Sequence, residues 1–214
     1  MYAGVCNEND TADGTNAFLS SPVKLILDVK NPGHVFISER AGPLKSMRIS
    51  DQNVTTLWNG EEGCLWMIQE PTTGNLFAAC RSFVGLFTGN GTLMIIAGSP
   101  LVNGFQDGSF KNSLFNKPVG MTFLDSETLI VTDFENDRLR VLDLRTNTTF
   151  SICSGTEGYD DGNLTSCQLA APYTVQKINN TIYVGDYKRI KSIKCEWKLK
   201  AKFQLAFFIC QFTR

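Results

Sequence analysis

Residues 97–142 read AGSPLVNGFQDGSFKNSLFNKPVGMTFLDSETLIVTDFENDRLRVL, and this stretch decides the fold. It begins with glycine-rich loop segments and continues, after Pro118, into short apolar, β-branched and aromatic runs that Asp, Asn and Gly separate. Such runs are typical of strands joined by tight turns. They predict strands over residues 119–123, 128–132 and 139–142, and a fourth strand follows over 149–153.

The landmarks of this stretch recur along the chain, which is the sign of a repeat architecture. An Asp-Gly pair precedes a proline in three places: Asp13, Gly14 and Pro22; Asp107, Gly108 and Pro118; Asp161, Gly162 and Pro172. The glycine and the proline are 10 residues apart in the second and third places, and Gly4 to Gly14 and Gly98 to Gly108 are also 10 residues. Gly4 and Gly98 are 94 residues apart, which is room for two units. A degenerate unit therefore begins at about Trp58, without the Asp-Gly loop and the proline.

Four strands in each unit of about 40–50 residues predict an all-β propeller. A single four-stranded blade cannot bury both of its faces, so neighbouring blades must supply the missing contacts. The predicted propeller covers residues 1–193, with blades at about 3–57, 58–96, 97–153 and 154–193. Residues 194–214 are predicted to form an irregular tail that is apolar and basic.

The third unit resembles the NHL repeat family. The matching segments are 104–108 (GFQDG), 115–120 (FNKPVG), 131–133 (VTD) and 136–140 (NDRLR). The resemblance covers roughly residues 3–193 and is weakest in the second unit. It implies an extracellular-type propeller that closes with six blades. This chain shows about four, so we expect an open or incomplete arc that is a segment of a longer protein.

Aspartates recur at the ends of strands, at Asp133 and Asp186, and in the Asp-Gly linkers. A short carboxylate at such a place accepts hydrogen bonds from turn N–H groups, so we interpret these residues as structural. One aspartate per loop is far short of the six or more oxygens that Ca²⁺ takes. His34 is the only histidine and no CxxC pair occurs, so we expect neither a metal nor a cofactor.

No catalytic residues are predicted. His34 follows a Pro-Gly turn and is interpreted as a surface histidine, and no nucleophile–base set can be assembled. Two related six-bladed groups are enzymes, the amidating lyases and the gluconolactonase-like hydrolases. The lyases need a histidine-ligated zinc, and no stray carboxylate cluster matches the hydrolases. A scaffold that binds a protein or glycan without catalysis is therefore the leading hypothesis, and an enzyme is an alternative.

An intracellular module that binds RNA is the other alternative that the resemblance leaves open. Nucleic-acid binding normally requires a basic face, whereas the net charge here is −1 and the pI is about 5.9. The best candidate for such a face is the cluster Lys188, Arg189, Lys191 and Lys194. We interpret it as the solvated side of a strand, so a nucleic-acid partner is not expected.

Sequons and cysteines indicate the compartment. Six acceptor sites for N-glycosylation occur, at Asn9, Asn53, Asn90, Asn147, Asn163 and Asn179. Asn53, Asn90 and Asn147 fall between the third and fourth strands of their predicted blades, which places them on one rim. Seven cysteines include two candidate disulfide pairs, Cys64–Cys80 and Cys153–Cys167. These features favour an extracellular or cell-surface location.

Two observations concern membranes and export. The longest apolar run, residues 205–210, is far shorter than the roughly 18 residues that a membrane-spanning helix needs. The first residues show no basic stretch followed by an apolar core, so we do not expect them to form a signal peptide. We expect no membrane span in this sequence.

Overall fold

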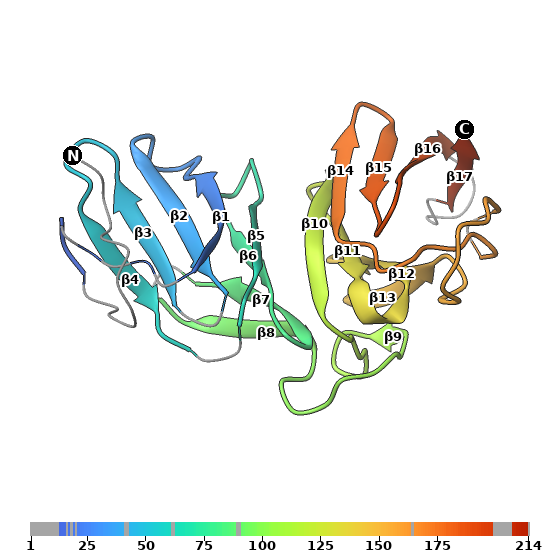
Figure 1. Cartoon of the computed structure of the whole chain (residues 1–214), viewed down its shortest axis with the longest axis horizontal. Coiled ribbons are helices and arrows are strands. Elements are labelled where there is room, and N and C mark those ends of the chain that lie inside the picture. Colours follow the sequence, from blue (N-terminus) through green and yellow to red (C-terminus); the bar gives the residue numbers. More distant parts are fainter. Residues whose placement is uncertain are drawn as a thin grey trace.

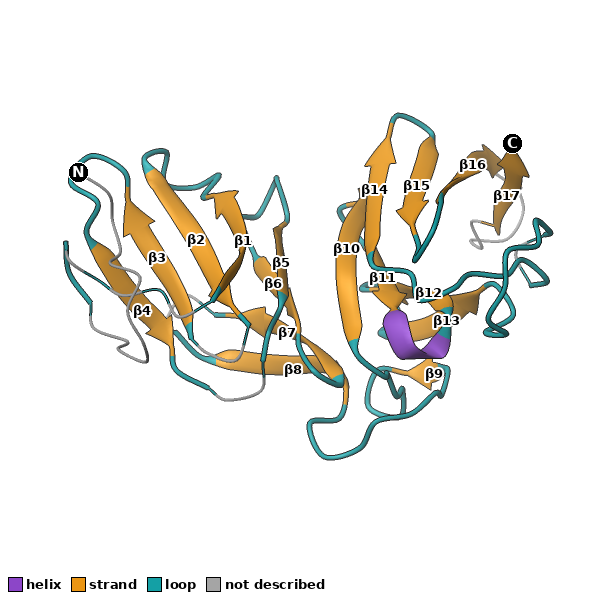
Figure 2. Ribbon diagram, viewed as in Figure 1, coloured by secondary structure: helices purple, strands orange, loops and turns teal. Residues whose placement is uncertain are grey.

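The computed structural model contains four antiparallel β-sheets that stand side by side in an open arc (Figure 1). It describes residues 13–15, 17, 19, 21–40, 43–60, 63–88, 91–163, 165–198 and 207–213, the last segment and 195–198 as backbone only. This part of the chain is strand and loop apart from one 3-10 turn, η1 (Phe134–Asn136) (Figure 2). The predicted all-β propeller of four-stranded blades is confirmed, with four blades that do not close into a ring.

Each sheet forms one blade, and its strands follow one another in chain order. Blade 1 contains β1 (Pro22–Leu27), β2 (His34–Glu39), β3 (Leu44–Arg48) and β4 (Val54–Trp58). Blade 2 contains β5 (Trp66–Gln69), β6 (Leu76–Ala79), β7 (Phe83–Phe87) and β8 (Leu93–Gly98). Blade 3 contains β10 (Pro118–Asp125), β11 (Thr128–Asp133), β12 (Arg138–Asp143) and β13 (Thr148–Ile152), with β9 (Gly108–Ser109) added at its outer edge. Blade 4 contains β14 (Thr174–Ile178), β15 (Thr181–Gly185), β16 (Ile190–Lys198) and β17 (Phe207–Thr213).

The hydrophobic core lies between the blades, because each inner blade is covered on both faces. Alternate residues of β11 show this arrangement: Leu129 and Val131 belong to the cluster shared with blade 2, whereas Ile130 belongs to the cluster shared with blade 4. All three side chains are fully buried. A strand buried on both faces reads as a continuous apolar run, which is the pattern of residues 129–131.

The innermost strands pack against one another along the arc. β5 contacts both β1 and β10, and β10 also contacts β14. The approach of β10 to blade 4 is so close that it requires glycine at position 120. A Cβ atom there would lie 2.7 Å from the carbonyl oxygen of Tyr173 and 3.0 Å from the Cα of Thr174.

The C-terminal segment differs from its prediction. Residues 194–214 were expected to be irregular, but β16 continues to Lys198 and pairs with β17. The physical reason is that a blade has four strands, and the apolar run at 205–210 has the β-rich composition to supply the last one. No helix in the described residues is long and apolar enough to cross a membrane.

Candidate functional site

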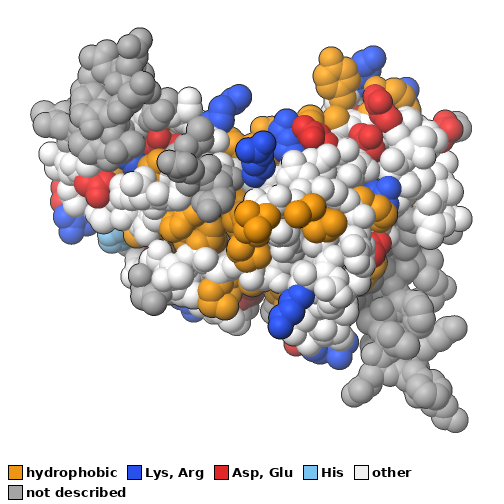
Figure 3. Space-filling view, turned by 90° about the horizontal axis from the view of Figure 1, so that it is seen from below, with side chains coloured by type: hydrophobic (Ala, Val, Ile, Leu, Met, Phe, Trp, Pro, Cys, Tyr) orange, Lys and Arg blue, Asp and Glu red, His pale blue; other side chains and the backbone are white. Residues whose placement is uncertain are grey.

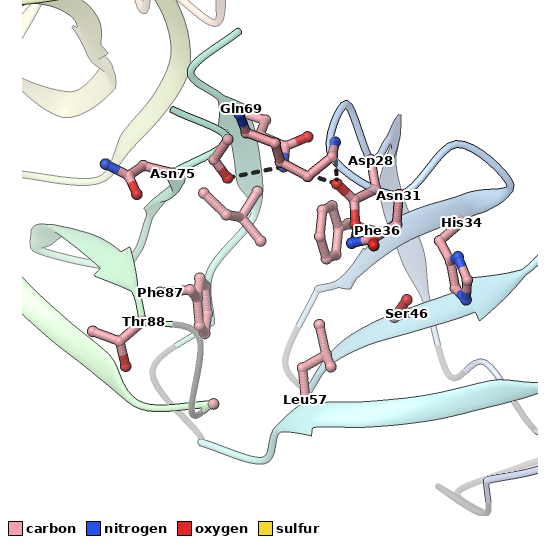
Figure 4. Close-up of a pocket in the computed structure, with 14 residues that line it drawn as sticks. Asp28, Asn31, His34, Phe36, Ser46, Leu57, Gln69, Asn75, Phe87 and Thr88 are labelled. Carbon is pink, nitrogen blue, oxygen red and sulfur yellow. Dashed lines mark hydrogen bonds between the residues drawn. The ribbon is translucent and has the colours of Figure 1, made fainter. Parts of the chain in front are cut away.

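A pocket of about 550 Å³ lies between blades 1 and 2 (Figure 4). It is lined from strands of both blades, and its walls combine apolar with polar side chains. Its lining includes Asp28, Lys30, His34, Phe36, Ser46 and Leu57 from blade 1, and Gln69, Leu76 and Phe87 from blade 2. Its volume is in the usual range for a small-molecule site.

The blade 1 wall follows from strand register. Ile26 pairs with Phe36, and the backbone N–H of Asp28 donates to the carbonyl of His34, so these four residues share one face of the sheet. Phe36 in turn pairs with Ser46 of β3. This face therefore presents a carboxylate, an imidazole, an aromatic ring and a small hydroxyl side chain to blade 2.

The blade 2 wall is a single row across the sheet. Gln69 pairs with Leu76, and Leu76 pairs with Phe87. All three side chains are buried. The row begins with an amide on the innermost strand and continues outward as apolar surface, so the pocket is polar near the inner strands and apolar beyond them.

Three hydrogen bonds join the two blades at the polar end of the pocket. The backbone N–H of Val29 donates to Gln69 Oε1 (2.7 Å). Gln69 Nε2 donates to Asp28 Oδ1 (3.0 Å), and Figure 4 shows this hydrogen bond. Lys30 Nζ donates to the carbonyl of Thr72 (2.7 Å). The stem of Lys30 crosses Gly74, where a Cβ atom would lie 2.2 Å from Lys30 Cγ. Glycine at that position makes room for the crossing lysine.

Asp28 is the acidic group of the pocket, with 7% of its surface exposed. Its carboxylate accepts hydrogen bonds from Asn31 Nδ2 (2.8 Å), Gln69 Nε2 (3.0 Å) and the backbone N–H of Lys30 (2.9 Å). Burial raises the pKa of Asp28, but these hydrogen bonds lower it by more, so the pKa lies below its ordinary value. The side chain is therefore ionised at neutral pH.

The pocket exists because large side chains do not fill this interface. Between blades 2 and 3, the rings of Phe77 and Phe123 meet edge to face with centroids 5.4 Å apart. Between blades 1 and 2, the residue paired with Phe36 is the small Ser46, and the aromatic contact is between Trp58 and Phe87. The alternation in residues 34–36 could have indicated that His34 faces blade 2, but not that the space there is open.

His34 therefore differs from its interpretation as a surface histidine. It is half-buried in the pocket wall, and its Nδ1 atom is buried with no hydrogen-bond partner among the described residues. The reason is strand alternation, because β2 begins at His34 itself rather than after it.

The predicted linker aspartates have structural contacts. Asp13 accepts hydrogen bonds from the N–H and hydroxyl of Thr56 (2.9 and 2.6 Å). Asp107 lies 2.9 Å from Arg140 Nη2 and accepts a bond from Ser151 (3.1 Å). Each linker is thereby tied to an outer strand of its own blade. Gly14 and Gly108 have φ of +113° and +127°, and Pro22 and Pro118 begin β1 and β10.

A buried cation in the third strand of three blades was missed by the sequence analysis. Arg140 is fully buried and donates to Asp133 (2.7 Å), to Asp107 and to the carbonyls of Leu114 and Gln106 (both 2.7 Å). The equivalent positions in blades 1 and 4 hold Lys45 and Lys191, and both are buried. A basic residue in the middle of an apolar strand was the available signal.

Lys191 illustrates the same arrangement in blade 4. Its Nζ donates to the carbonyls of Tyr159 (2.8 Å) and Gln168 (2.9 Å) and lies 3.3 Å from Asp161. This contact ties the third Asp-Gly linker to its blade, and Pro172 stands two residues before β14. It also removes Lys191 from the candidate basic face, because a buried amine cannot reach a phosphate. Asp186 accepts hydrogen bonds from the turn N–H groups of Lys188 (3.2 Å) and Arg189 (2.8 Å), as predicted.

Blade 2 has a disulfide where the other blades have the ionic contacts. Strand register places Cys80 at the position of the strand-ending acid and Gly85 at the position of the buried cation. Cys80 is bonded to Cys64, and a second disulfide joins Cys153 to Cys167 in the linker before blade 4. Both candidate pairs are thus present. Among the described residues, no group of three His, Cys, Asp or Glu side chains could hold a metal ion.

Four of the six sequons lie in the described part of the chain. Asn53, Asn147 and Asn179 lie in the β3–β4, β12–β13 and β14–β15 turns, and Asn163 lies in the linker before blade 4. Asn147, Asn163 and Asn179 are exposed, and Asn53 is partly exposed. In an antiparallel four-stranded blade, the first and third turns leave from the same end. The three turn asparagines therefore share one rim, whereas Asn9 and Asn90 lie outside the described residues.

Exposed apolar side chains also occur outside the pocket. Figure 3 shows a band of them across the face seen from below, with charged side chains of both signs dispersed around it. Exposed apolar residues on β8 and in the linker that follows it include Met94, Ile95, Leu101 and Val102, and Leu101 is 91% exposed. Apolar patches of this kind often mark interaction surfaces.

Comparisons with known proteins support the fold. No protein-family model matches the chain. Over 95 residues it is 34% identical to "Protein SUPPRESSOR OF QUENCHING 1, chloroplastic" of Arabidopsis thaliana, which is 41% of this chain and 9% of that protein. So short a shared segment does not establish a family.

Solved structures share the fold at low sequence identity. A Bacteroides thetaiotaomicron protein of unknown function has a TM-score of 0.68 and 19% identity, over 78% of this chain and 46% of that one. An auxiliary nutrient-binding protein of Bacteroides ovatus has a TM-score of 0.68 and 16% identity, over 82% and 48%. A chain of a nidogen/laminin complex has a TM-score of 0.59 and 18% identity, over 82% and 60%. The chain spans about half the length of the two bacterial proteins.

Proposed function

We propose that this chain is a non-catalytic binding module of the NHL propeller type, which holds a small ligand between blades 1 and 2. The observation that carries the proposal is the 550 Å³ pocket, which is polar at one end and apolar at the other. Binding sites for small molecules combine apolar walls with a few placed polar groups in this way. The polar side chains Asp28 and Gln69 hydrogen-bond to each other, which fixes their positions at the polar end of the pocket.

The NHL assignment is supported by what the shared motif residues do. Phe105 of the GFQDG segment stacks under Arg138, whose guanidinium carbon lies 3.6 Å from the ring centroid. Asp107 of the same segment binds Arg140. The repeated residues thus interlock linker and blade, which gives a physical reason for their recurrence.

An extracellular or cell-surface location is part of the proposal. Two disulfides favour an oxidising compartment, and exposed sequons would be available to glycosylation. The similar structures named above include a nutrient-binding protein and a chain of a laminin complex, so a macromolecular protein or glycan partner on the outer surface is proposed as well.

The experiment is ligand-observed NMR with a library of small fragments on the chain secreted from mammalian cells. Wild type is expected to bind fragments that Ser46→Phe no longer binds, because a ring at position 46 would fill the pocket. Gln176→Phe, at an exposed strand position of blade 4, is the matched control and should keep the binding. Fragments recovered unchanged after long incubation would agree with binding alone. A fragment set that Ser46→Phe binds equally well, or that is chemically altered, would contradict the proposal.

A further inference from the structure

We propose that the ligand of this pocket is a small organic monocation, an amine carried on an aromatic or branched apolar body. This inference rests on the proposed binding function and specifies the chemistry of its ligand. Three features of the pocket carry it: the charge at its polar end, the positions of the other charged groups, and the apolar walls.

The polar end carries a negative charge without a cationic partner. Asp28 is 7% exposed, and its hydrogen-bond donors are all neutral amides: the side chains of Asn31 and Gln69 and the backbone N–H groups of Lys30 and Asn31. No ion pair involves Asp28 within the described ranges, in contrast to Asp133, whose carboxylate lies 2.7 Å from Arg140. Neutral donors satisfy the lone pairs of the carboxylate but do not cancel its charge. An ammonium group would supply the opposite charge and replace a neutral hydrogen bond with a charged, stronger one.

The other ionisable groups around the pocket are compatible with a cation. Lys30 also lines the pocket and keeps its charge, but its ammonium group is held at the Thr72 carbonyl (2.7 Å) and its stem lies over Gly74, and it forms no ion pair with Asp28 in the described structure. His34 lines the same pocket with a buried Nδ1 that lacks a partner in the described structure.

The remaining walls fit an apolar body rather than a polar one. Phe36 lies on the same face of the sheet as Asp28, two residues along β2 from His34, which stands opposite Asp28. Leu57, Leu76 and Phe87 supply the other large apolar side chains of the lining, beside the small Ser46 and Thr88. An ammonium bound at Asp28 would lie near the Phe36 ring, where a cation–π contact adds to the attraction. The attached body would then extend between Phe36 and Phe87 (Figure 4).

The test compares three probes that share one apolar body: 2-phenylethylamine, 2-phenylethanol and 3-phenylpropanoate. Dissociation constants are measured by NMR titration of the secreted wild-type chain, of Asp28→Asn and of Asp51→Asn. Asp51 is the matched control, because it is an exposed acid in the β3–β4 turn, outside the pocket. In wild type the amine should bind about tenfold more tightly than the alcohol, and the carboxylate should bind most weakly.

The variants identify the group responsible. Asp28→Asn should bring the amine and the alcohol within about twofold of each other, whereas Asp51→Asn should keep the wild-type ratio. Equal binding of amine and alcohol by wild type would overturn the proposed ligand class while leaving a binding pocket in place. Absence of binding by all three probes would overturn both this inference and the pocket function. The wild-type comparison needs no variant, so the test stands even if Asp28→Asn does not fold.

Discussion

Single residues decide how firmly each linker is held to its blade. Arg140 is the clearest case, because its fully buried guanidinium contacts Asp133, Asp107 and two carbonyl groups. A buried ion pair is not in itself a strong stabiliser, but loss of one partner leaves an uncompensated charge in the interior. Arg140 is therefore important because its removal would leave the buried carboxylate of Asp133 without a charged partner.

Arg140→Met is therefore expected to lower the free energy of unfolding by about 3–5 kcal/mol. Arg145→Met is the matched control, because that side chain is 55% exposed and its nearest carboxylate oxygens are 3.8 and 3.9 Å away. It should cost about 1 kcal/mol or less. Urea unfolding followed by tryptophan fluorescence measures both. Similar losses in the two variants would show that burial of this pair is unimportant.

Glu70 provides a pH-dependent contribution at the same scale. Burial raises the pKa of this carboxyl, but hydrogen bonds from Thr73 and Thr72 outweigh it and bring the pKa down to about 2, from an ordinary 4.5. A lowered native pKa means that the ionised form stabilises the fold above the unfolded-state pKa. The contribution is complete above pH 4.5 and is lost as the pH falls toward about 2.

Glu70→Gln should thus be less stable than wild type near neutral pH, and the difference should shrink as the pH falls from 4.5 to about 2. Urea midpoints across this range measure it. The same series for Glu127→Gln, in the corresponding turn of blade 3, is the control for general acid effects. A difference between wild type and Glu70→Gln that stays constant with pH would refute the assignment.

At the scale of the element, blade 2 is distinguished by its covalent bond. Cys64 and Cys80 are 16 residues apart, and Cys80 stands where the other blades have the strand-ending acid, whereas Gly85 takes the place of the buried cation. A disulfide that closes a loop of this size contributes about 3 kcal/mol in the chain-entropy model.

Cys64→Ala with Cys80→Ala should accordingly weaken blade 2 by about 3 kcal/mol. Native-state hydrogen exchange resolves the effect by blade. Protection should fall in β5–β8 and stay near wild type in β12 and β13, which carry no disulfide. Uniform loss of protection along the chain would mean that the blades do not respond separately.

The sequence predicted blades much better than it predicted what lies between them. The strands of blade 3 lie within two residues of their predicted bounds, because Pro118, Asp133 and the flanking turns mark the ends of each apolar run. β17 was missed because residues 205–210 stand apart from any repeated landmark. The pocket could not be predicted, because strand alternation shows that Phe36 faces blade 2 but not what faces Phe36.

At the scale of the whole molecule, the two rims differ in their turns. The rim formed by the first and third turns of each blade holds Asn53, Asn147 and Asn179, and Asp28 and the polar end of the pocket lie at this rim as well. The other rim holds the long Asp-Gly linkers. A glycosylated rim would leave the pocket open to small molecules and would direct large partners to other surfaces.

After secretion from mammalian cells, glycans are expected at Asn53, Asn147 and Asn179. Glycopeptide mass spectrometry locates them, and N-glycosidase treatment should lower the intact mass by the sum of the glycans. The three exposed or partly exposed turns are accessible to the transferase, which is why we expect occupancy there. A secreted chain without glycans at these turns would contradict the expected use of this rim.

Gly120 allows the innermost strands of blades 3 and 4 to approach each other closely. Because the backbone of β10 nearly touches that of Tyr173 and Thr174, blades 3 and 4 are pinched together at the axis and free to spread at the periphery. This close approach contributes to the curvature of the arc, and curvature determines how many blades complete a circle. A methyl group at position 120 would push the inner strands apart and flatten the arc. The number of blades that can complete the circle thus depends in part on position 120, where the residue has no side chain.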